Sequence, residues 1–472
     1  MNISKKQFYA FQFLLVIYYY FKFFSFISSE SIWYDDAHEL LISKINLFDI
    51  EDLIGIADYH IGFSLLLLLI TYVTDLQYIY FLISFLFCCS LIAVGVLVGD
   101  KLKSRSSVLI SQLALLASPV IIQYSFRPKH FVFEFLIILI LSIYLHSTSD
   151  SKLIFLCFIP VIIFSGVSVI YLIYPAFKSL REKFDLKYLL YILIIVLFVF
   201  QRGSKKLFSE RFQEYWELDS IGLFESFERL LLNNLLFIRS FNDSGFLLIT
   251  SFCLFVGIFQ LFKKNRELFL FLFVPALILN SLSFFNLYPI GKGRTDLILF
   301  PILFFAIYYF ANLCDEKFKP KILIFVFLTF VLVVLPVNTE SKVDNMSSML
   351  MQTDLSSFDQ VYITYYSIPQ FILYTDNLSE FKVDMAGEKC SYSSKTPKIK
   401  FLQTSPDDFC SPSTDLSFIK DSIKNNKKIA IIGHDSKTQN ILFFVESDEL
   451  LFSNLKITKV GKDELIIATL NK

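Results

Sequence analysis

The chain has 472 residues, of which 55% are hydrophobic, 17% aromatic and only 18% charged. Soluble domains carry about 25% charged residues, so this composition excludes an ordinary soluble protein and indicates a polytopic membrane protein. Lys plus Arg equals Asp plus Glu at 43 each, so the charge balance favours neither nucleic acid nor an acidic partner.

The first element is an apolar and aromatic run from Phe8 to Ile27, which is long enough to cross a bilayer because about 20 residues suffice. Lys5 and Lys6 precede this run, and almost no basic residue follows it before Lys44. The positive-inside rule therefore predicts a cytoplasmic N-terminus and an outward-facing segment after the run. No small-residue cleavage site follows, so we expect a retained helix.

The outward-facing segment, residues 28–60, is acidic and is centred on Trp-Tyr-Asp-Asp-Ala-His-Glu at 33–39. The next run, Ile61 to Thr74, is apolar but short, and runs of this length more often lie at the interface than span the bilayer. Counting it as a span would place the basic segment 101–105 outside, against the positive-inside rule. We therefore expect it to lie along the outer surface.

The remaining charge clusters predict about 11 membrane helices within residues 1–336, because helices satisfy their own backbone polar groups in lipid. A long outer loop is expected over 201–244. The other expected spans are 77–99, 108–124, 131–145, two short helices within 153–177, 188–200, 245–262, 268–285, 295–312 and 322–336. The chain is thus predicted to be a multi-pass protein of the plasma (inner) membrane.

The tail, residues 337–472, has ordinary polar composition and is predicted to be an exoplasmic (periplasmic) domain. Strand-like runs mixed with helical patterns predict a small α/β fold. These runs are 361–364, 428–432 and 464–467. Cys390 and Cys410 either form a disulfide in an oxidising compartment or remain two free thiols.

The expected topology brings many polar groups to the outer face. They are Asp35, Asp36, Glu39, His60, Arg127, Lys129, His130, Glu134, Tyr215, Trp216, Tyr288, Lys292 and Arg294. Carboxylates beside cations suit sugar transfer from a lipid phosphate, because the carboxylate deprotonates the acceptor hydroxyl while the cations hold the departing phosphate. Gly291 and Gly293 would let the backbone and cations approach phosphate oxygens closely.

Each candidate also has a purely structural interpretation. Asp35 or Asp36 would cap the helix that follows, where Asp favours the N-terminus. Glu134 begins an apolar span, where a carboxylate is costly and therefore a functional hypothesis, but it would also pair with Lys129 or His130. Interfacial anchoring accounts equally for Tyr215, Trp216, Lys292 and Arg294. We assign no metal site, because lone histidines are more often structural.

The motifs in this order resemble the GT-C superfamily of polyprenyl-phosphate-sugar-dependent glycosyltransferases, in its protein-mannosyltransferase-like branch. The matching segments are Trp33-Tyr34-Asp35-Asp36-Ala37, Tyr59-His60-Ile61-Gly62-Phe63, Tyr124-Ser125 with Lys129, Phe131 and Glu134, Tyr215-Trp216, Tyr288-Pro289 with Gly291 and Arg294, and the tail segment 361–370. The chain departs from the family in carrying Arg127 where many relatives have Glu.

The resemblance implies an inverting transfer of a sugar from a polyprenyl-phosphate carrier to a glycan, lipid or protein acceptor. A first-loop Asp would be the general base, with Asp35 slightly favoured over Asp36, because the family's first acid is usually the catalytic one. Arg294, Lys292 and Lys129 would stabilise the departing phosphate. No cofactor is expected; some superfamily members use a divalent cation, but the branch resembled here generally does not.

Two other functions fit the same composition. A polysaccharide or lipid-linked sugar flippase would place charges in the middle of helices, whereas this chain keeps its helix centres almost free of charge. A catalytically inactive membrane scaffold of the same fold would tolerate loss of Asp35 and Asp36 without a change in the glycans of the cell.

Overall fold

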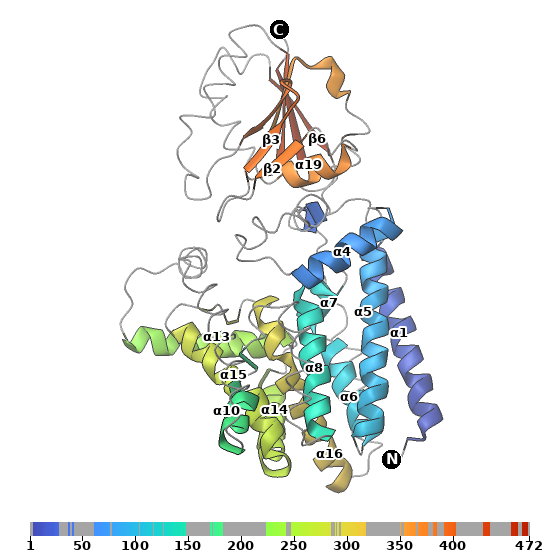
Figure 1. Ribbon diagram of the computed structural model, residues 1–472, viewed down its shortest axis with the longest axis vertical. Coiled ribbons are helices and arrows are strands. Elements are labelled where there is room, and N and C mark those ends of the chain that lie inside the picture. Colours follow the sequence, from blue (N-terminus) through green and yellow to red (C-terminus); the bar gives the residue numbers. More distant parts are fainter. Residues whose placement is uncertain are drawn as a thin grey trace. The chain divides into compact units, whose positions relative to one another are not determined.

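The computed structural model is mostly helical, and the chain divides into two compact units (Figure 1). Each unit is described separately below. The residues that the structure describes are 3–27, 36–37, 40–41, 61–75, 78–102, 104–116, 118–125, 127–147, 170–171, 173–182, 223–241, 247–284, 288, 290–291, 294–317, 350, 354–364, 367–375, 381–384, 391–402, 428–434, 455–460 and 465–470.

The first unit is helical and comprises Met1–Phe24, His60–Phe63 and Tyr80–Thr339. Its described elements are all or most of α1 (Lys5–Ile27), α5 (Ile79–Lys101), α6 (Arg105–Leu116), α7 (Pro119–Tyr124), α8 (Phe131–Ser147), α10 (Ile173–Glu182), α13 (Leu223–Phe241), α14 (Leu247–Lys264), α15 (Arg266–Phe284), the 3-10 helix η3 (Arg294–Leu299) and α16 (Phe300–Lys317).

Three of the helices within the described residues are long and apolar enough to cross a membrane: Ile79–Gly99, Arg266–Phe284 and Thr295–Cys314. They coincide closely with three of the predicted spans, and they are consistent with a membrane protein. The apolar helices at Arg105–Leu116 and Phe131–Tyr144 are shorter. The predicted spans 188–200 and 322–336, and residues 153–169 of the pair of helices predicted within 153–177, lie outside the described residues.

The single helix predicted over 108–124 is wrong, because the structure divides it into α6 and α7. Ser118 between them has an extended backbone (φ −67°, ψ 125°) and Pro119 is the first residue of α7. Proline has no N–H to donate to the preceding turn, and its ring disfavours helical geometry in the residue before it. The helix therefore ends before Pro119, and a new one begins there.

The predicted outer loop over 201–244 also differs from the structure, because its second half contains the 19-residue helix α13. This helix has an apolar and a polar side, and its charged residues lowered the local hydropathy enough for the segment to be interpreted as a loop. The first half of the predicted loop, up to residue 222, lies outside the described residues.

Basic segments that were assigned to one side of the membrane lie together in the first unit. The Arg105 side chain donates a hydrogen bond to the carbonyl of Ile3 (3.4 Å), which joins the basic segment 101–105 to the N-terminus. Lys178 of α10, at the start of the basic segment 178–187, lies 2.7 Å from Glu267 of α15, which directly follows the basic segment 263–266. Each pair thus agrees with the relative placement that the charge pattern predicts.

A buried pair of amides connects α1 to α6. Gln12 donates from Nε2 to Oε1 of Gln112 (2.5 Å), and Gln112 donates back to Gln12 (3.1 Å). Both side chains are almost fully buried. A Cβ on Gly95 of α5 would overlap both amides, so the absence of a side chain at Gly95 makes room for the pair. Reciprocal bonding leaves little of either amide unsatisfied in an apolar setting.

The second unit comprises Ser25–Tyr59, Ser64–Ile79 and Glu340–Lys472. Its tail contains a five-stranded sheet in the order β4-β1-β5-β7-β6, with β1, β4 and β5 parallel and β7 antiparallel to its neighbours β5 and β6. The elements of the unit are most of α4 (Ile61–Val73), η4 (Leu355–Ser357), β1 (Gln360–Thr364), α19 (Ile368–Tyr374), β2 (Phe381–Asp384), β3 (Ser391–Ser394), β4 (Ile399–Leu402), β5 (Ile429–His434), β6 (Leu455–Val460) and β7 (Leu465–Leu470).

The three runs predicted as strands in the tail are strands β1, β5 and β7. Residues 361–364 and 429–432 are buried, as expected for parallel strands covered on both faces, which read as continuous apolar runs. Cys390 and Cys410, the predicted disulfide candidates, lie outside the described residues.

The contact of α14 with α16 provides a first test of the helical unit. A Cβ on Gly257 of α14 would overlap the backbone carbonyl of Ala306 in α16. We expect Gly257→Ala to lower the free energy of unfolding by about 1–3 kcal/mol, because overpacking forces the helices apart. Thermal unfolding of purified protein in detergent measures this, with Phe255→Ala on the exposed side of α14 as the control. An equal melting temperature for both variants would contradict the close packing.

Candidate functional site

Charged and polar side chains are buried at the beginning of α8. Arg127, Lys129, His130 and Glu134 are each less than 10% exposed. A buried charge is unfavourable unless it is paired, so four such side chains within eight residues mark an unusual location in an apolar unit. All four are among the sequence-predicted candidates.

The contacts of this cluster, which we call the α8 cluster (Arg127, Lys129, His130 and Glu134), orient its members. His130 Nε2 lies 3.8 Å from Glu134 Oε1, one helical turn away. The Arg127 guanidinium lies over the ring of Tyr124, 5.3 Å from its centroid, which is a cation–π distance. Phe63 packs edge-on against His130. The segment at 59–63, predicted to belong to the site, thus reaches the α8 cluster through its last residue.

The second wall of the site is the turn from Tyr288 to Gly291, which leads into η3. The Tyr288 hydroxyl donates to the Thr295 carbonyl (2.8 Å), and the Gly291 N–H donates to Oδ1 of Asp296 (2.8 Å). Gly291 has a φ of +83°, a conformation that favours glycine. Two hydrogen bonds therefore link the turn to η3.

The α8 cluster and this turn lie close together, because α8 packs against η3. Burial raises the pKa of Tyr288 well above its usual value, and the negative charges of Glu134 and Asp296 raise it further. The Tyr288 hydroxyl therefore stays protonated and remains a hydrogen-bond donor. Glu134 and Tyr288, two residues far apart in sequence that were both predicted for the site, share one electrostatic environment.

Two further residues, Asn233 of α13 and Tyr171, contact the turn and η3. A Cβ on Gly291 would lie 2.7 Å from the Asn233 carbonyl oxygen of α13, so only glycine fits between the turn and this helix. Tyr171, fully buried, donates from its hydroxyl to the Ile298 carbonyl of η3 (2.7 Å). The turn and η3 are thus fixed against α13 and against the segment 170–171.

The remaining sequence-predicted residues are placed differently. Asp36 belongs to the second unit, where it is helical and fully buried together with Ala37. Arg294 is the first residue of η3, and its side chain lies outside the part of the chain that the structure describes. The candidates Asp35, Glu39, His60, Tyr215, Trp216 and Lys292 lie outside the described residues.

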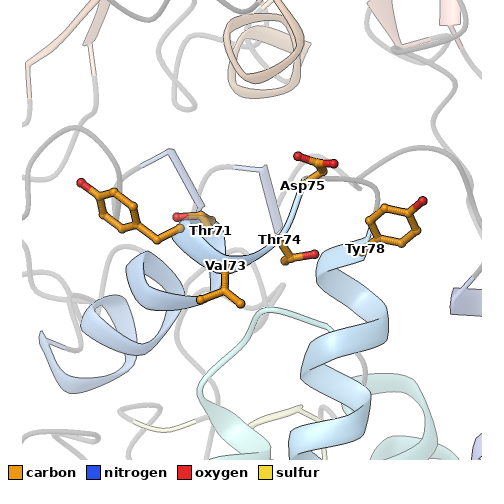
Figure 2. A pocket seen from close by; sticks show the side chains of 6 residues that line it. Thr71, Val73, Thr74, Asp75 and Tyr78 are labelled. Atoms are coloured by element: carbon orange, nitrogen blue, oxygen red, sulfur yellow. The ribbon is translucent and has the colours of Figure 1, made fainter.

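An open hollow of about 310 Å³ lies at the connection between α4 and α5 in the second unit (Figure 2). Its lining residues are Thr71, Tyr72, Val73, Thr74, Asp75 and Tyr78. Figure 2 shows the Asp75 carboxylate and the Tyr78 hydroxyl directed away from the helices. Tyr72, Asp75 and Tyr78 are exposed to solvent, so this hollow lacks the desolvated charges that distinguish the α8 cluster.

No group of three or more His, Cys, Asp or Glu side chains among the described residues is arranged to hold a metal ion. Sequence reasoning missed three residues of the site: Tyr171, Asn233 and Asp296. An acid in the first turn of the helix that starts at Arg294 was a usable signal for Asp296. Tyr171 and Asn233 act through contacts with distant segments, which no local pattern indicates.

Comparison with known proteins adds no relative to these observations. No protein-family model, no curated protein and no solved structure matches the chain significantly.

The hydrogen bond between Gly291 and Asp296 can be tested by two substitutions at one position. Asp296→Ala leaves the Gly291 N–H without its acceptor, and we expect it to lower the free energy of unfolding by about 1–3 kcal/mol. Asp296→Asn keeps an oxygen that can accept the hydrogen bond from Gly291, so it should lower the free energy of unfolding clearly less. Thermal unfolding in detergent compares the two; equal losses would show that the carboxylate charge, and not this hydrogen bond, stabilises η3.

Proposed function

We propose that the chain is an integral membrane glycosyltransferase that moves a sugar from a polyprenyl-phosphate carrier to a glycan, lipid or protein acceptor on the outer face. In this proposal residues 1–336 form a GT-C-like module of about 11 helices, and residues 337–472 form an exoplasmic α/β domain. The plasma (inner) membrane would contain the chain with its N-terminus in the cytoplasm.

The observation that supports the proposal best is the burial of two cations, Arg127 and Lys129, in the α8 cluster. A phosphate is the kind of ligand that a buried guanidinium and ammonium group would bind, because charge-assisted hydrogen bonds to phosphate are stronger than neutral ones. Lys292 and Arg294 follow the turn at 288–291 in the sequence, and η3, which begins at Arg294, packs against α8.

The proposed reaction is a single displacement at the anomeric carbon of the sugar. A first-loop aspartate, Asp35 or Asp36, accepts the proton of the acceptor hydroxyl as that oxygen bonds to the anomeric carbon. The bond from the anomeric carbon to the phosphate oxygen breaks at the same time, with inversion. The electron pair leaves on the polyprenyl phosphate, whose added charge Lys129, Lys292 and Arg294 stabilise.

Tyr288 would have a positioning role in the site. Its raised pKa keeps the hydroxyl protonated at neutral pH. In the structure this donor is occupied by Thr295, so its contribution to the reaction is to hold the turn in place.

The carboxylate role is tested by mass spectrometry of surface glycans and glycolipids from a deletion strain complemented with variants. Wild type should restore a sugar unit that is lost on deletion. Asp35→Asn or Asp36→Asn should fail to restore it, since loss of a general base slows a reaction by about 10²–10⁴-fold. Asp75→Asn, an exposed carboxylate of the second unit, is the matched control and should restore it.

The outcome of this experiment also separates the rival functions. Rescue by both first-loop variants would support an inactive scaffold and contradict the enzyme. Accumulation of lipid-linked sugar on the cytoplasmic side in the deletion strain, with Asp35→Asn and Asp36→Asn active, would indicate a flippase. An unchanged glycan and glycolipid profile on deletion would overturn the proposed transfer.

The phosphate role of the cations is tested by direct binding of polyprenyl phosphate to purified protein in detergent. Lys129→Met and Arg294→Gln should each weaken binding by about 10–100-fold, because a hydrogen bond to a charged group contributes about 1.5–3 kcal/mol. Lys264→Met, at the exposed end of α14, is the control for loss of one positive charge. Unchanged affinity in both site variants would place the phosphate elsewhere.

A further inference from the structure

The helix α13 exposes an apolar surface that nothing else in the described part of the chain covers. Phe227, Leu231, Leu232 and Leu235 are each at least half exposed. Phe227, Leu231 and Leu235 are spaced four residues apart, so they form one row along the helix. Among residues 226–239, the other exposed side chains are Glu228 and Arg239. An amphipathic helix normally buries such a row, and here the row faces outward.

The opposite face of α13 is attached to the helical unit. Asn233 and Phe237 are buried. Asn234 donates from Nδ2 to Oδ1 of Asn280 in α15 (2.7 Å), and α13 also packs against α14. The exposed row is therefore not the result of a helix that has failed to dock. The helix docks through Asn233, Asn234 and Phe237, and the row of exposed Phe and Leu side chains is left for another partner.

The depth of this contact indicates the partner. The candidate span Arg266–Phe284 ends four residues after Asn280, so α13 meets α15 about 6 Å from the end of the span at 1.5 Å per residue. Interfacial amphipathic helices lie about 5–10 Å into the boundary between headgroups and acyl chains. Figure 1 shows α13 running across the direction of α5 and α8, as a helix in the plane of a membrane would.

Apolar side chains are also exposed on the two helices against which α13 packs. Leu277, one turn before Asn280 in α15, is exposed, as are Phe252, Phe255 and Phe259 on α14. Both neighbours are apolar helices of the membrane-like unit, and α15 is a candidate span. A single covering medium, the lipid acyl chains, accounts for the exposed side chains of all three helices.

We propose that α13 lies in the membrane interface, with Phe227, Leu231 and Leu235 in contact with lipid acyl chains. Because the Asn233 carbonyl of α13 lies against Gly291, the helix would hold the turn at 288–291 at the depth of lipid headgroups. This inference is independent of the proposed glycosyl transfer, because it is tested only by contact of α13 with lipid.

The test uses tryptophan fluorescence of the full chain in liposomes. Trp33 and Trp216, the two tryptophans of the chain, are replaced by Phe, and a single reporter is introduced as Leu231→Trp. Lipids brominated near the headgroup should quench this reporter more strongly than lipids brominated near the chain end. The matched control, Phe237→Trp on the buried face of the same helix, should be quenched at least about twofold less.

A second exposed reporter, Leu235→Trp, keeps the test decisive if Phe237→Trp does not fold. Leu235→Trp should reproduce the depth preference of Leu231→Trp. Strongest quenching by the deeply brominated lipid would overturn an interfacial position. Absence of quenching at both exposed positions would show that water, another segment or a second copy of the chain covers the row, and would equally overturn the proposal.

Discussion

The first unit depends on the burial of charge at the beginning of α8. Arg127, Lys129 and Glu134 are removed from water there, which is unfavourable unless neighbouring groups compensate. The turn at 288–291 and η3 form the adjoining wall, fixed by hydrogen bonds from Tyr288 and Gly291. This wall comes from a segment more than 150 residues away in the sequence, and it meets the cluster because η3 packs against α8.

Much of the helical architecture could be predicted from the sequence. Helices are the solution that satisfies the backbone of long apolar runs in lipid, so α5, α15 and the candidate span Thr295–Cys314 begin and end close to the predicted limits. Hydropathy alone missed the break before Pro119 and the helix α13. In both cases a local signal was present: proline in an otherwise helical run, and apolar residues four apart within a polar segment.

The candidate site was predictable only in part. Glu134 and Tyr288 were identified from motifs, and the structure shows that they are close, although their role in a reaction remains a proposal. Tyr171 was not identified because its hydroxyl bonds to a carbonyl 127 residues further along the chain. Contacts of this range arise from the packing of helices, and hydrophobic periodicity contains no information about them.

The amide pair of Gln12 and Gln112 has a consequence for how the first helix can be exchanged. A generic apolar anchor in place of α1 would match its length and hydrophobicity, yet it would leave the Gln112 amide and the space above Gly95 without a partner. The first helix is therefore a specific part of the folded unit, in addition to any function as a signal for membrane insertion.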